Sequence, residues 1–207
     1  MIQFISLITS LFLVSNLIGT SQVSYSSNTV KSLKVVLEKN SNLVINGKTN
    51  VNKFQCAYEG ALPYDTMAVE VNGADNKFFI DNAQASVQVK RFDCGAGGIT
   101  NDFRDLLKAD QHPLLKINIL SFTMKPSDES DHQWDQGKAE VKFTIAGESV
   151  VYPVYFDILD QDHDQFYVGT ITIDITDFSL QPPSKFLGLL VVNKEVEIDF
   201  KINLQVI

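Results

Sequence analysis

Near its C-terminus the chain reads Glu195-Val-Glu-Ile-Asp-Phe-Lys-Ile-Asn-Leu-Gln-Val206, a strict alternation of polar and apolar side chains. Successive side chains of a β-strand point to opposite faces of the sheet, so this pattern predicts a strand with one wet face and one dry face. Such strands belong to antiparallel sheets, because parallel sheets are covered on both faces. The apolar set is Val196, Ile198, Phe200, Ile202, Leu204 and Val206.

The same alternation recurs in earlier segments. It is clear at Ala139–Ile145, at Val150–Ile158 and at Tyr167–Ile175, and shorter strands are indicated around residues 33–37, 43–45, 54–58 and 83–89. We expect eight or nine antiparallel strands in all, which form a sandwich or close into a barrel. A barrel of that size encloses one small ligand or is filled by its own side chains, and the alternation does not distinguish the two.

Local signals refine this pattern. The alternation between residues 115 and 124 slips by one at Ile119–Leu120, which predicts a β-bulge. Pro153 predicts an edge or a bulge in its strand, because proline has no amide hydrogen to donate. Asn46-Gly47 and Asn72-Gly73 are typical of hairpin turns.

One segment, at about residues 99–109, is predicted to be an amphipathic helix. Ile99, Phe103, Leu106 and Leu107 recur at helical spacing, and charged residues cover the other face. Thr100 is the candidate N-terminal cap, and Pro113 prevents continuation.

An apolar loop at about residues 178–190 follows the strand that ends at Ile175. Pro182, Pro183 and Gly188 interrupt it, so it is neither a regular strand nor a long helix. Two interpretations remain open: a lid over an apolar ligand at the mouth of a barrel, or a plug that completes the core.

Residues 1–21 are predicted to be a signal peptide, because the run from Met1 is apolar and the first charged side chain is Lys31. The alternative is an uncleaved membrane anchor. Residues 22–207 then form one domain in the periplasm or outside the cell. In such a compartment Cys56 and Cys94 are expected to form a disulfide, the alternative being two separate buried thiols.

Composition argues against charged partners. The formal net charge is -8, with 44% hydrophobic and 20% charged residues. An acidic globular chain repels phosphate backbones and anionic membrane surfaces, so nucleic acid is not an expected partner. Once the signal peptide is cleaved, we expect that the mature chain is not an integral membrane protein.

Catalytic chemistry is not indicated. His112, His132 and His163 lie at a helix end or in acidic loops, and no Gly-x-Ser-x-Gly or phosphate-binding motif occurs. The acidic loops 128–132 and 160–164 suggest a metal-dependent enzyme as a competing hypothesis, although neither has EF-hand spacing. We therefore expect no catalytic residue, no metal and no cofactor.

Several motifs together resemble the YceI-like proteins, the lipocalin-like polyisoprenoid-binding group of exported bacterial proteins. The family's Gly-x-(Ser/Thr)-Asn-Val-x-x-Phe-x-Cys segment is similar to Gly47–Cys56, and its helix with a following (Tyr/His)-Pro is similar to Asn101–Pro113, which comes after Asp93-Cys94. Its Thr-Ile-x-Gly turn resembles Phe143–Gly147, and its Asp-Phe-x-Leu-x-Pro-Pro segment resembles Asp177–Pro183. The family's usual N-terminal segment, with a histidine in the first strand, is missing here.

This resemblance implies an eight-stranded antiparallel barrel with an apolar tunnel for a long isoprenoid, isoprenoid quinone or fatty-acyl chain. It implies a binding protein that sequesters or carries the lipid, is not an enzyme, and leaves open a homodimer. The phase of the strands gives Phe143, Phe156, Ile171, Ile173 and Phe200 as tunnel candidates. The helix and lid add Phe103, Leu107, Phe186, Leu187 and Leu190.

A structural or interaction protein with a filled barrel is the alternative. Its partner surface would be the apolar outward positions Val151, Pro153, Tyr155 and Leu159.

Overall fold

A computed structural model describes residues 31–62, 66–74, 77–124, 134–162, 164–185 and 190–207. The predicted signal peptide lies outside these residues. The helices are η1 (Val89–Arg91), α1 (Gly97–Leu106) and η2 (Ile175–Phe178). The strands are β1 (Lys31–Leu37), β2 (Asn42–Lys48), β3 (Lys53–Tyr58), β4 (Thr66–Ala74), β5 (Lys77–Asp81), β6 (Gln84–Gln88), β7 (Phe92–Asp93), β8 (Leu114–Met124), β9 (Trp134–Ile145), β10 (Glu148–Gln161), β11 (Asp164–Asp174), β12 (Ser184–Lys185), β13 (Leu190–Val191) and β14 (Glu195–Val206).

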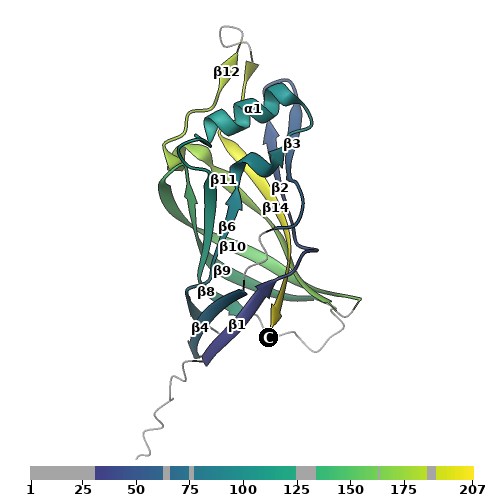
Figure 1. Cartoon of the computed structure of the whole chain (residues 1–207), viewed down its shortest axis with the longest axis vertical. Helices are drawn as coiled ribbons and strands as arrows, with labels where there is room; N and C mark the ends of the chain where they lie inside the picture. Colours follow the sequence, from purple (N-terminus) through teal and green to yellow (C-terminus); the bar gives the residue numbers. More distant parts are fainter. Residues whose placement is uncertain (1–30, 63–65, 75–76, 125–133, 163, 186–189) are drawn as a thin grey trace, which may run out of the picture.

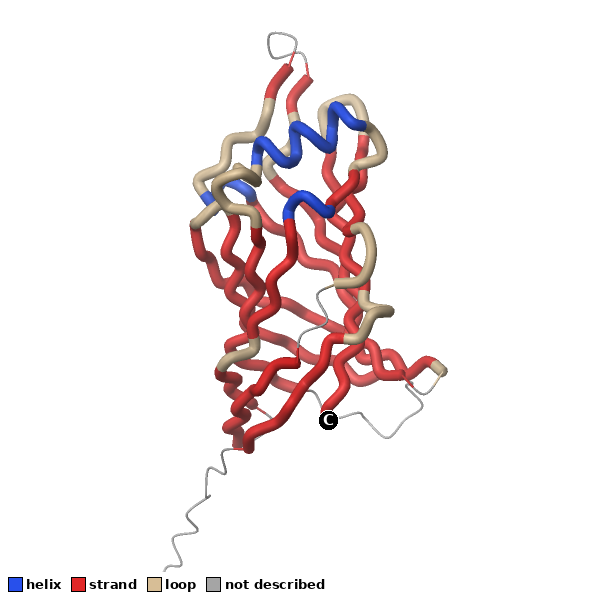
Figure 2. Tube along the Cα trace, in the orientation of Figure 1, coloured by secondary structure: helices blue, strands red, loops and turns tan. Residues whose placement is uncertain are grey.

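Eight antiparallel strands form a closed ring. Their order is β1-β4-β5-β8-β9-β10-β11-β14, and β14 returns to β1 through Val35↔Val206 and Leu37↔Leu204. The ring is the lower and middle part of the barrel in Figure 1, and α1 lies across its upper end (Figures 1 and 2). The predicted all-β, lipocalin-like barrel is confirmed.

The strands outnumber the expected eight or nine because long strands change partner along their length and because the structure has three two-residue strands, β7, β12 and β13. β14 pairs with β1 near its end and with β2 over Glu197–Lys201, and β8 pairs with both β5 and β6. Where β14 changes partner, the backbone amide of Asn203 donates to Oγ of Ser41 at 2.9 Å. The Ser41 hydroxyl thereby provides an acceptor for the buried amide of Asn203, which pairs in neither the β14–β1 nor the β14–β2 ladder.

Two local predictions hold in the sheet. The register between β8 and β9 shifts between Ile119 and Ser121, which confirms the β-bulge. Pro153 lies on a free edge, as expected: β10 pairs with β9 from Glu148 to Leu159, but with β11 over Asp157–Gln161 alone. Proline is tolerated where no second strand needs its amide.

Both hairpin-turn predictions are wrong in position. Asn46 and Gly47 lie within β2, and the turn falls at Thr49–Asn52, where Oγ1 of Thr49 accepts from the amide of Asn52 at 2.8 Å. Asn72 and Gly73 likewise lie inside β4. Gly47 instead leaves space for a side chain, because the ring of Phe54, which is opposite in the β2–β3 ladder, covers it.

Helix α1 starts earlier and ends earlier than the predicted 99–109. Its N-terminal cap is Ala96, with no side-chain hydrogen bond, so the prediction that Thr100 caps it is wrong. Thr100 lies inside the helix, and its hydroxyl donates to Asp93 at 2.9 Å and accepts from the amide of Cys94 at 3.0 Å. A side chain committed to β7 cannot also cap the helix.

Within the described part of the chain, no helix is long and apolar enough to cross a membrane.

The segment predicted as an apolar lid begins as part of the core. Phe178 and Leu180 are buried, and Ser179 has a left-handed backbone with φ of 55°. The start of the segment therefore acts as a plug. Beyond it, β12 and β13 pair through Lys185↔Leu190 and form the hairpin at the top of Figure 1. Phe186 and Leu187 lie outside the described residues.

The core has two parts. The larger joins the inward faces of the barrel strands to α1, η1 and η2, with Phe92, Val89 and Phe178 fully buried. A smaller cluster around Val69 and Ile80 lies between β1, β4 and β5. Core packing is therefore concentrated at the end that α1 covers.

Candidate functional site

The predicted strand candidates all point into the barrel, but they differ in burial. Phe143, Ile171 and Ile173 are buried members of the main core. Phe156 and Phe200 are only partly buried against it. The ladders place these residues on inward positions, since Ile171 pairs with Ile198 and Phe200 with Gly169.

The helix candidates close one end of the barrel. Phe103 and Leu107 are buried in the main core, and the ring of Phe103 lies 5.4 Å from that of Phe92. Of the lid candidates, Leu190 is in β13 and its side chain is outside the described set, as are Phe186 and Leu187. A role for any of these residues in ligand binding stays a prediction.

Three inward phenylalanine rings lie flat on glycines of the neighbouring strand. The pairs are Phe54 on Gly47, Phe156 on Gly137 and Phe200 on Gly169, each directly opposite in an antiparallel ladder. A Cβ atom added to the glycine would lie 2.1, 2.3 and 2.7 Å, respectively, from the ring. Because each ring occupies the space of the missing side chain, it lies along the wall and extends less into the interior.

Strand β14 has an apolar inward face that its neighbours cover only in part. Its inward residues, Val196, Ile198, Phe200, Ile202 and Leu204, are all partly exposed. β14 is flanked by β11 on one side and by β1 and β2 on the other, so neighbouring strands cover its edges. The exposed surface of these apolar side chains therefore faces the inside of the barrel.

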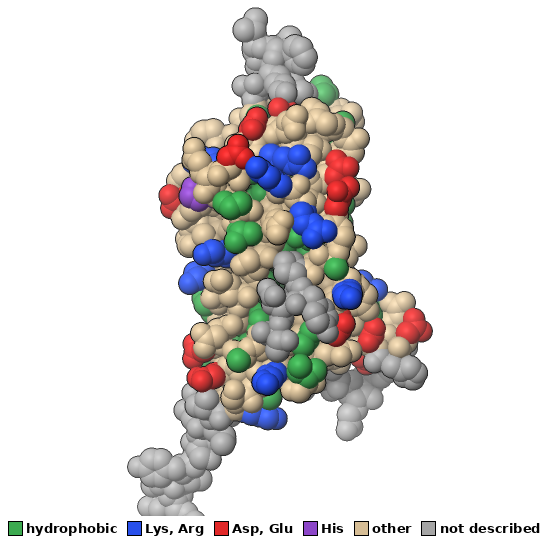
Figure 3. All heavy atoms as spheres, viewed as in Figure 1, with side chains coloured by type: hydrophobic (Ala, Val, Ile, Leu, Met, Phe, Trp, Pro, Cys, Tyr) green, Lys and Arg blue, Asp and Glu red, His purple; other side chains and the backbone are tan. Residues whose placement is uncertain are grey.

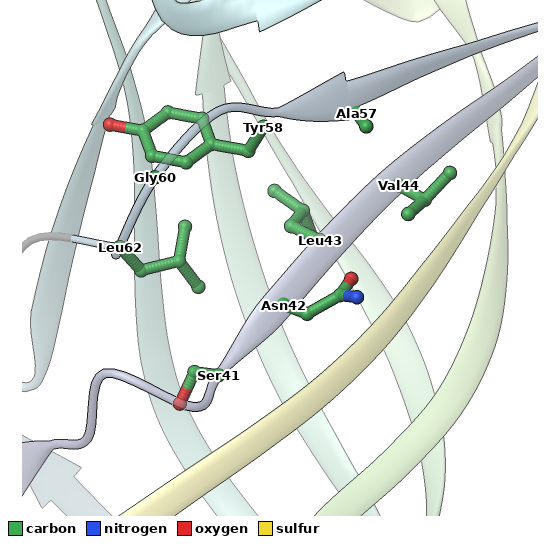
Figure 4. A pocket seen from close by; sticks show the side chains of 8 residues that line it. All are labelled: Ser41, Asn42, Leu43, Val44, Ala57, Tyr58, Gly60 and Leu62. Atoms are coloured by element: carbon green, nitrogen blue, oxygen red, sulfur yellow. The ribbon is translucent and has the colours of Figure 1, made fainter.

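A pocket of about 220 Å³ opens in the wall beside this strand (Figure 4). The ladder between β2 and β3 ends at Val44↔Ala57, and beyond this pair, toward Ser41 and Tyr58, the two strands separate. We call the opening the fork pocket. Ser41, Asn42, Leu43, Val44, Ala57, Tyr58, Gly60 and Leu62 line it.

None of the fork-pocket residues was predicted from sequence. Leu43 and Tyr58 lie in strand segments that the alternation detects, but a pocket arises only where two strands part. Past Ala57, β3 no longer pairs with β2, while on its other edge Tyr58 pairs with Phe92 of β7. No pattern in either segment indicates that third strand.

The disulfide holds β3 beside this third strand. Cys56 and Cys94 are bonded, which confirms the pairing, and both are buried in the main core. Cys94 follows β7 directly and precedes α1, so the bond ties the helix to the wall that contains the fork pocket.

A polar cluster lies at η2. The hydroxyl of Tyr152 donates to Oδ2 of Asp177 at 2.5 Å. Burial is the main cause that raises the pKa of Tyr152 to about 12, and this hydrogen bond is the second cause. Hydrogen bonds from Lys194 and Thr176 lower the pKa of Asp174 to about 2. Among the described residues of this cluster, no nucleophile stands beside a general base. The cluster attaches η2 to β10.

The competing metal hypothesis gains no support. The described residues contain no group of three or more His, Cys, Asp or Glu side chains arranged to hold a metal ion. Loop 128–132 and His163 lie outside the described residues.

A closed antiparallel ring with an apolar interior and a covered end is a lipocalin-like barrel. Residues 59–204 match the family model of the YceI-like domain, so the chain belongs to the YceI-like family. The resemblance found in the motifs is thereby confirmed. No curated protein matches the chain.

Two solved structures have similar folds. BcnA of Burkholderia cenocepacia has 16% identity and a TM-score of 0.57, over 80% of this chain and 96% of that one. A polyisoprenoid binding domain from Saccharophagus degradans, implicated in plant cell wall breakdown, has 13% identity and the same TM-score of 0.57, over 84% and 99%. At these identities the likeness concerns the fold.

Proposed function

We propose that this protein is an exported, non-catalytic binding protein that holds a long-chain apolar ligand inside its barrel. The ligand is a polyisoprenoid, an isoprenoid quinone or a fatty-acyl amphiphile, and it is carried or sequestered without chemical change. The observation that carries the proposal is the inward face of β14, whose five apolar side chains remain partly exposed within a closed ring.

Energetics support an apolar chain as the ligand. Removing each methylene group from water contributes about 0.8 kcal/mol, so a long chain needs few polar contacts to bind. The aromatic rings that lie on Gly137 and Gly169 present flat apolar faces to the interior. The polyisoprenoid-binding domain of similar fold provides a precedent for the ligand class.

Export is supported by two features of the chain. The first thirty residues carry no Asp, Glu, Lys or Arg, as expected for a signal peptide. The Cys56–Cys94 disulfide favours an oxidising compartment, which for a YceI-like protein means the periplasm or the exterior.

The test is mass spectrometry of an organic extract from the purified protein, combined with calorimetric titration of the delipidated protein with farnesol. We expect a stoichiometric lipid in the extract and saturable binding of farnesol. Recovery of no lipid together with no farnesol binding contradicts the proposal.

A second candidate function is an interaction protein with β10 as its contact strand. Val151 and Tyr155 are 47% and 65% exposed, and Pro153 lies between them on the same face. Size-exclusion chromatography of Tyr155→Asp tests it: a shift to smaller size favours this function. An unchanged elution volume, with lipid still bound, favours the lipid-binding proposal.

A further inference from the structure

The fork pocket is too small to enclose a long-chain ligand. Its volume of about 220 Å³ lies below the roughly 300–1,000 Å³ of pockets that enclose a small molecule. It can therefore hold one end of such a ligand while the remainder lies elsewhere.

The inner side of the fork pocket is continuous with the barrel core. Leu62 is a buried member of the main core, and Leu43 and Tyr58 are partly buried against it. Leu43 is also opposite Phe200, one of the partly exposed inward residues of β14. The apolar side of the fork pocket therefore belongs to the same core that lines the barrel.

The guanidinium group of Arg91 lies against two residues that line the fork pocket, Tyr58 and Gly60. Cζ of Arg91 lies 5.5 Å from the centre of the Tyr58 ring. Nη2 of Arg91 lies 2.3 Å from where a Cβ atom of Gly60 would be, and Gly60 has φ of +79°. The amide of Glu59 donates to the carbonyl of Arg91 at 2.8 Å, which fixes the backbone of η1 against these residues. Glycine at position 60 is therefore what lets the guanidinium approach Tyr58.

Arg91 differs from the other arginine of the chain. Arg104 donates from Nη2 to the carbonyls of Lys90 and Phe92, so its guanidinium is committed to holding η1 and β7 against α1. Arg91 is exposed, and its described contacts are with an aromatic face and a glycine. On the face in Figure 3, basic side chains are interspersed with apolar and acidic ones, so no broad basic surface competes for anions there. A planar guanidinium suits bidentate contact with a phosphate or a carboxylate.

We propose that the fork pocket binds the anionic head group, phosphate or carboxylate, of an amphiphile whose tail occupies the barrel, with Arg91 contacting the head. This inference rests on the proposed function and adds to it the chemistry of the head group and the place where it lies.

Calorimetric titration with matched pairs of ligands tests the inference. Farnesyl monophosphate is compared with farnesol, and palmitate with hexadecanol, on the delipidated wild type and on Arg91→Gln, Arg91→Lys and Lys77→Gln. Lys77→Gln is the control, because Lys77 also lies over an exposed ring, that of Phe79 at 5.0 Å, but on β5. We expect the wild type to bind one of the anionic ligands about tenfold more tightly than its alcohol, as one charge-assisted contact provides.

The variants decide the role of Arg91. Arg91→Gln removes the preference for the anion and leaves alcohol binding within about twofold, Arg91→Lys retains part of it, and Lys77→Gln retains all of it. Tighter binding of the phosphate or of the palmitate distinguishes the two head groups. Equal affinities for anion and alcohol in the wild type, or an anion preference that survives Arg91→Gln, overturn the inference while the lipid-binding proposal stands. If no ligand of either pair binds, the proposed function fails and the inference with it.

Discussion

Replacing Gly137 by alanine would place a methyl group 2.3 Å from Cζ of Phe156, far closer than two unbonded carbon atoms approach. Phe156 is directly opposite Gly137 in the β9–β10 ladder, so the ring has to leave the wall and turn toward the interior. Overpacked sites lose about 1–3 kcal/mol of stability, and we expect Gly137→Ala to fall in this range.

Gly169→Ala is expected to cost more than Gly137→Ala. Its added methyl group would lie 2.7 Å from the Phe200 ring and also 2.6 Å from the backbone carbonyl oxygen of Tyr155. A ring can rotate about its side-chain bonds, but a backbone oxygen moves only if strands β10 and β11 separate. We therefore expect a loss of about 3 kcal/mol or more, at the upper end of the range for overpacking.

Gly98→Ala is the matched control for both. Nothing lies within 4 Å of its added Cβ, and the residue is in α1, where alanine stabilises a helix interior by up to about 1 kcal/mol relative to glycine. The predicted order of stability is Gly98→Ala first, then Gly137→Ala, then Gly169→Ala. Urea unfolding measures the free energies of unfolding that give this order. In thermal unfolding, each kcal/mol corresponds to a shift in melting temperature of about 2–4 °C for a domain of this size.

Ligand binding separates this reasoning from a general loss of stability. If the displaced Phe156 ring enters the space for the ligand, Gly137→Ala weakens farnesol binding, and adding Phe156→Leu restores it by removing the collision. Equal stabilities for the three glycine variants would refute the argument that ring and backbone contacts set the cost. Weakened binding that Phe156→Leu does not restore would refute the argument that the ring obstructs the interior.

Three further predictions concern the disulfide, the η2 cluster and the partner change of β14. Replacing Cys56 and Cys94 together by alanine should cost about 3–4 kcal/mol in urea unfolding, since the bond closes a loop with a sequence separation of 38; a loss below about 1 kcal/mol would contradict the chain-entropy estimate. Because the folded pKa of Tyr152 is about 12, above its ordinary value of 10.0, the contribution of its protonated hydroxyl is complete below about pH 10 and is lost as pH rises toward 12; Tyr152→Phe should remove this part of the alkaline loss of stability, and an unchanged pH profile would show that titration of Tyr152 is not its source. Ser41→Ala should lower the free energy of unfolding by about 1–3 kcal/mol, because the amide of Asn203 loses its acceptor, and a change near zero would mean that another group replaces the hydroxyl.

Elements that depend on neighbouring residues could be predicted from the sequence. The alternation of β14 identified its inward face, and the slip at Ile119–Leu120 identified the bulge, because both follow from the period of a strand. The prediction of a hairpin turn at Asn46-Gly47 failed because the dipeptide alone does not determine its role. The same dipeptide satisfies a tight turn or a glycine beneath a ring, and the choice depends on where Phe54 lies across the ladder.

The candidate site was predictable only in part. The phase placed Phe156 and Phe200 on inward positions, but it did not reveal the glycines opposite them, because alternation within one strand does not specify which residue of the next strand lies opposite. The fork pocket could not be predicted at all. It exists because the β2–β3 ladder ends at Val44↔Ala57, and no pattern within one strand determines where its pairing with the next strand ends.

By itself, the amino-acid sequence determined that this chain is a set of two-faced antiparallel strands with one helix, because side-chain period is a local property, and its two cysteines made a disulfide the expected pairing. Closure of the ring, the position of each aromatic ring on its glycine and the approach of Arg91 to Tyr58 were decided by the tertiary structure. The physical reason is that side chains distant in sequence share space only after the strands have paired, and the volume left between them is a property of that packing.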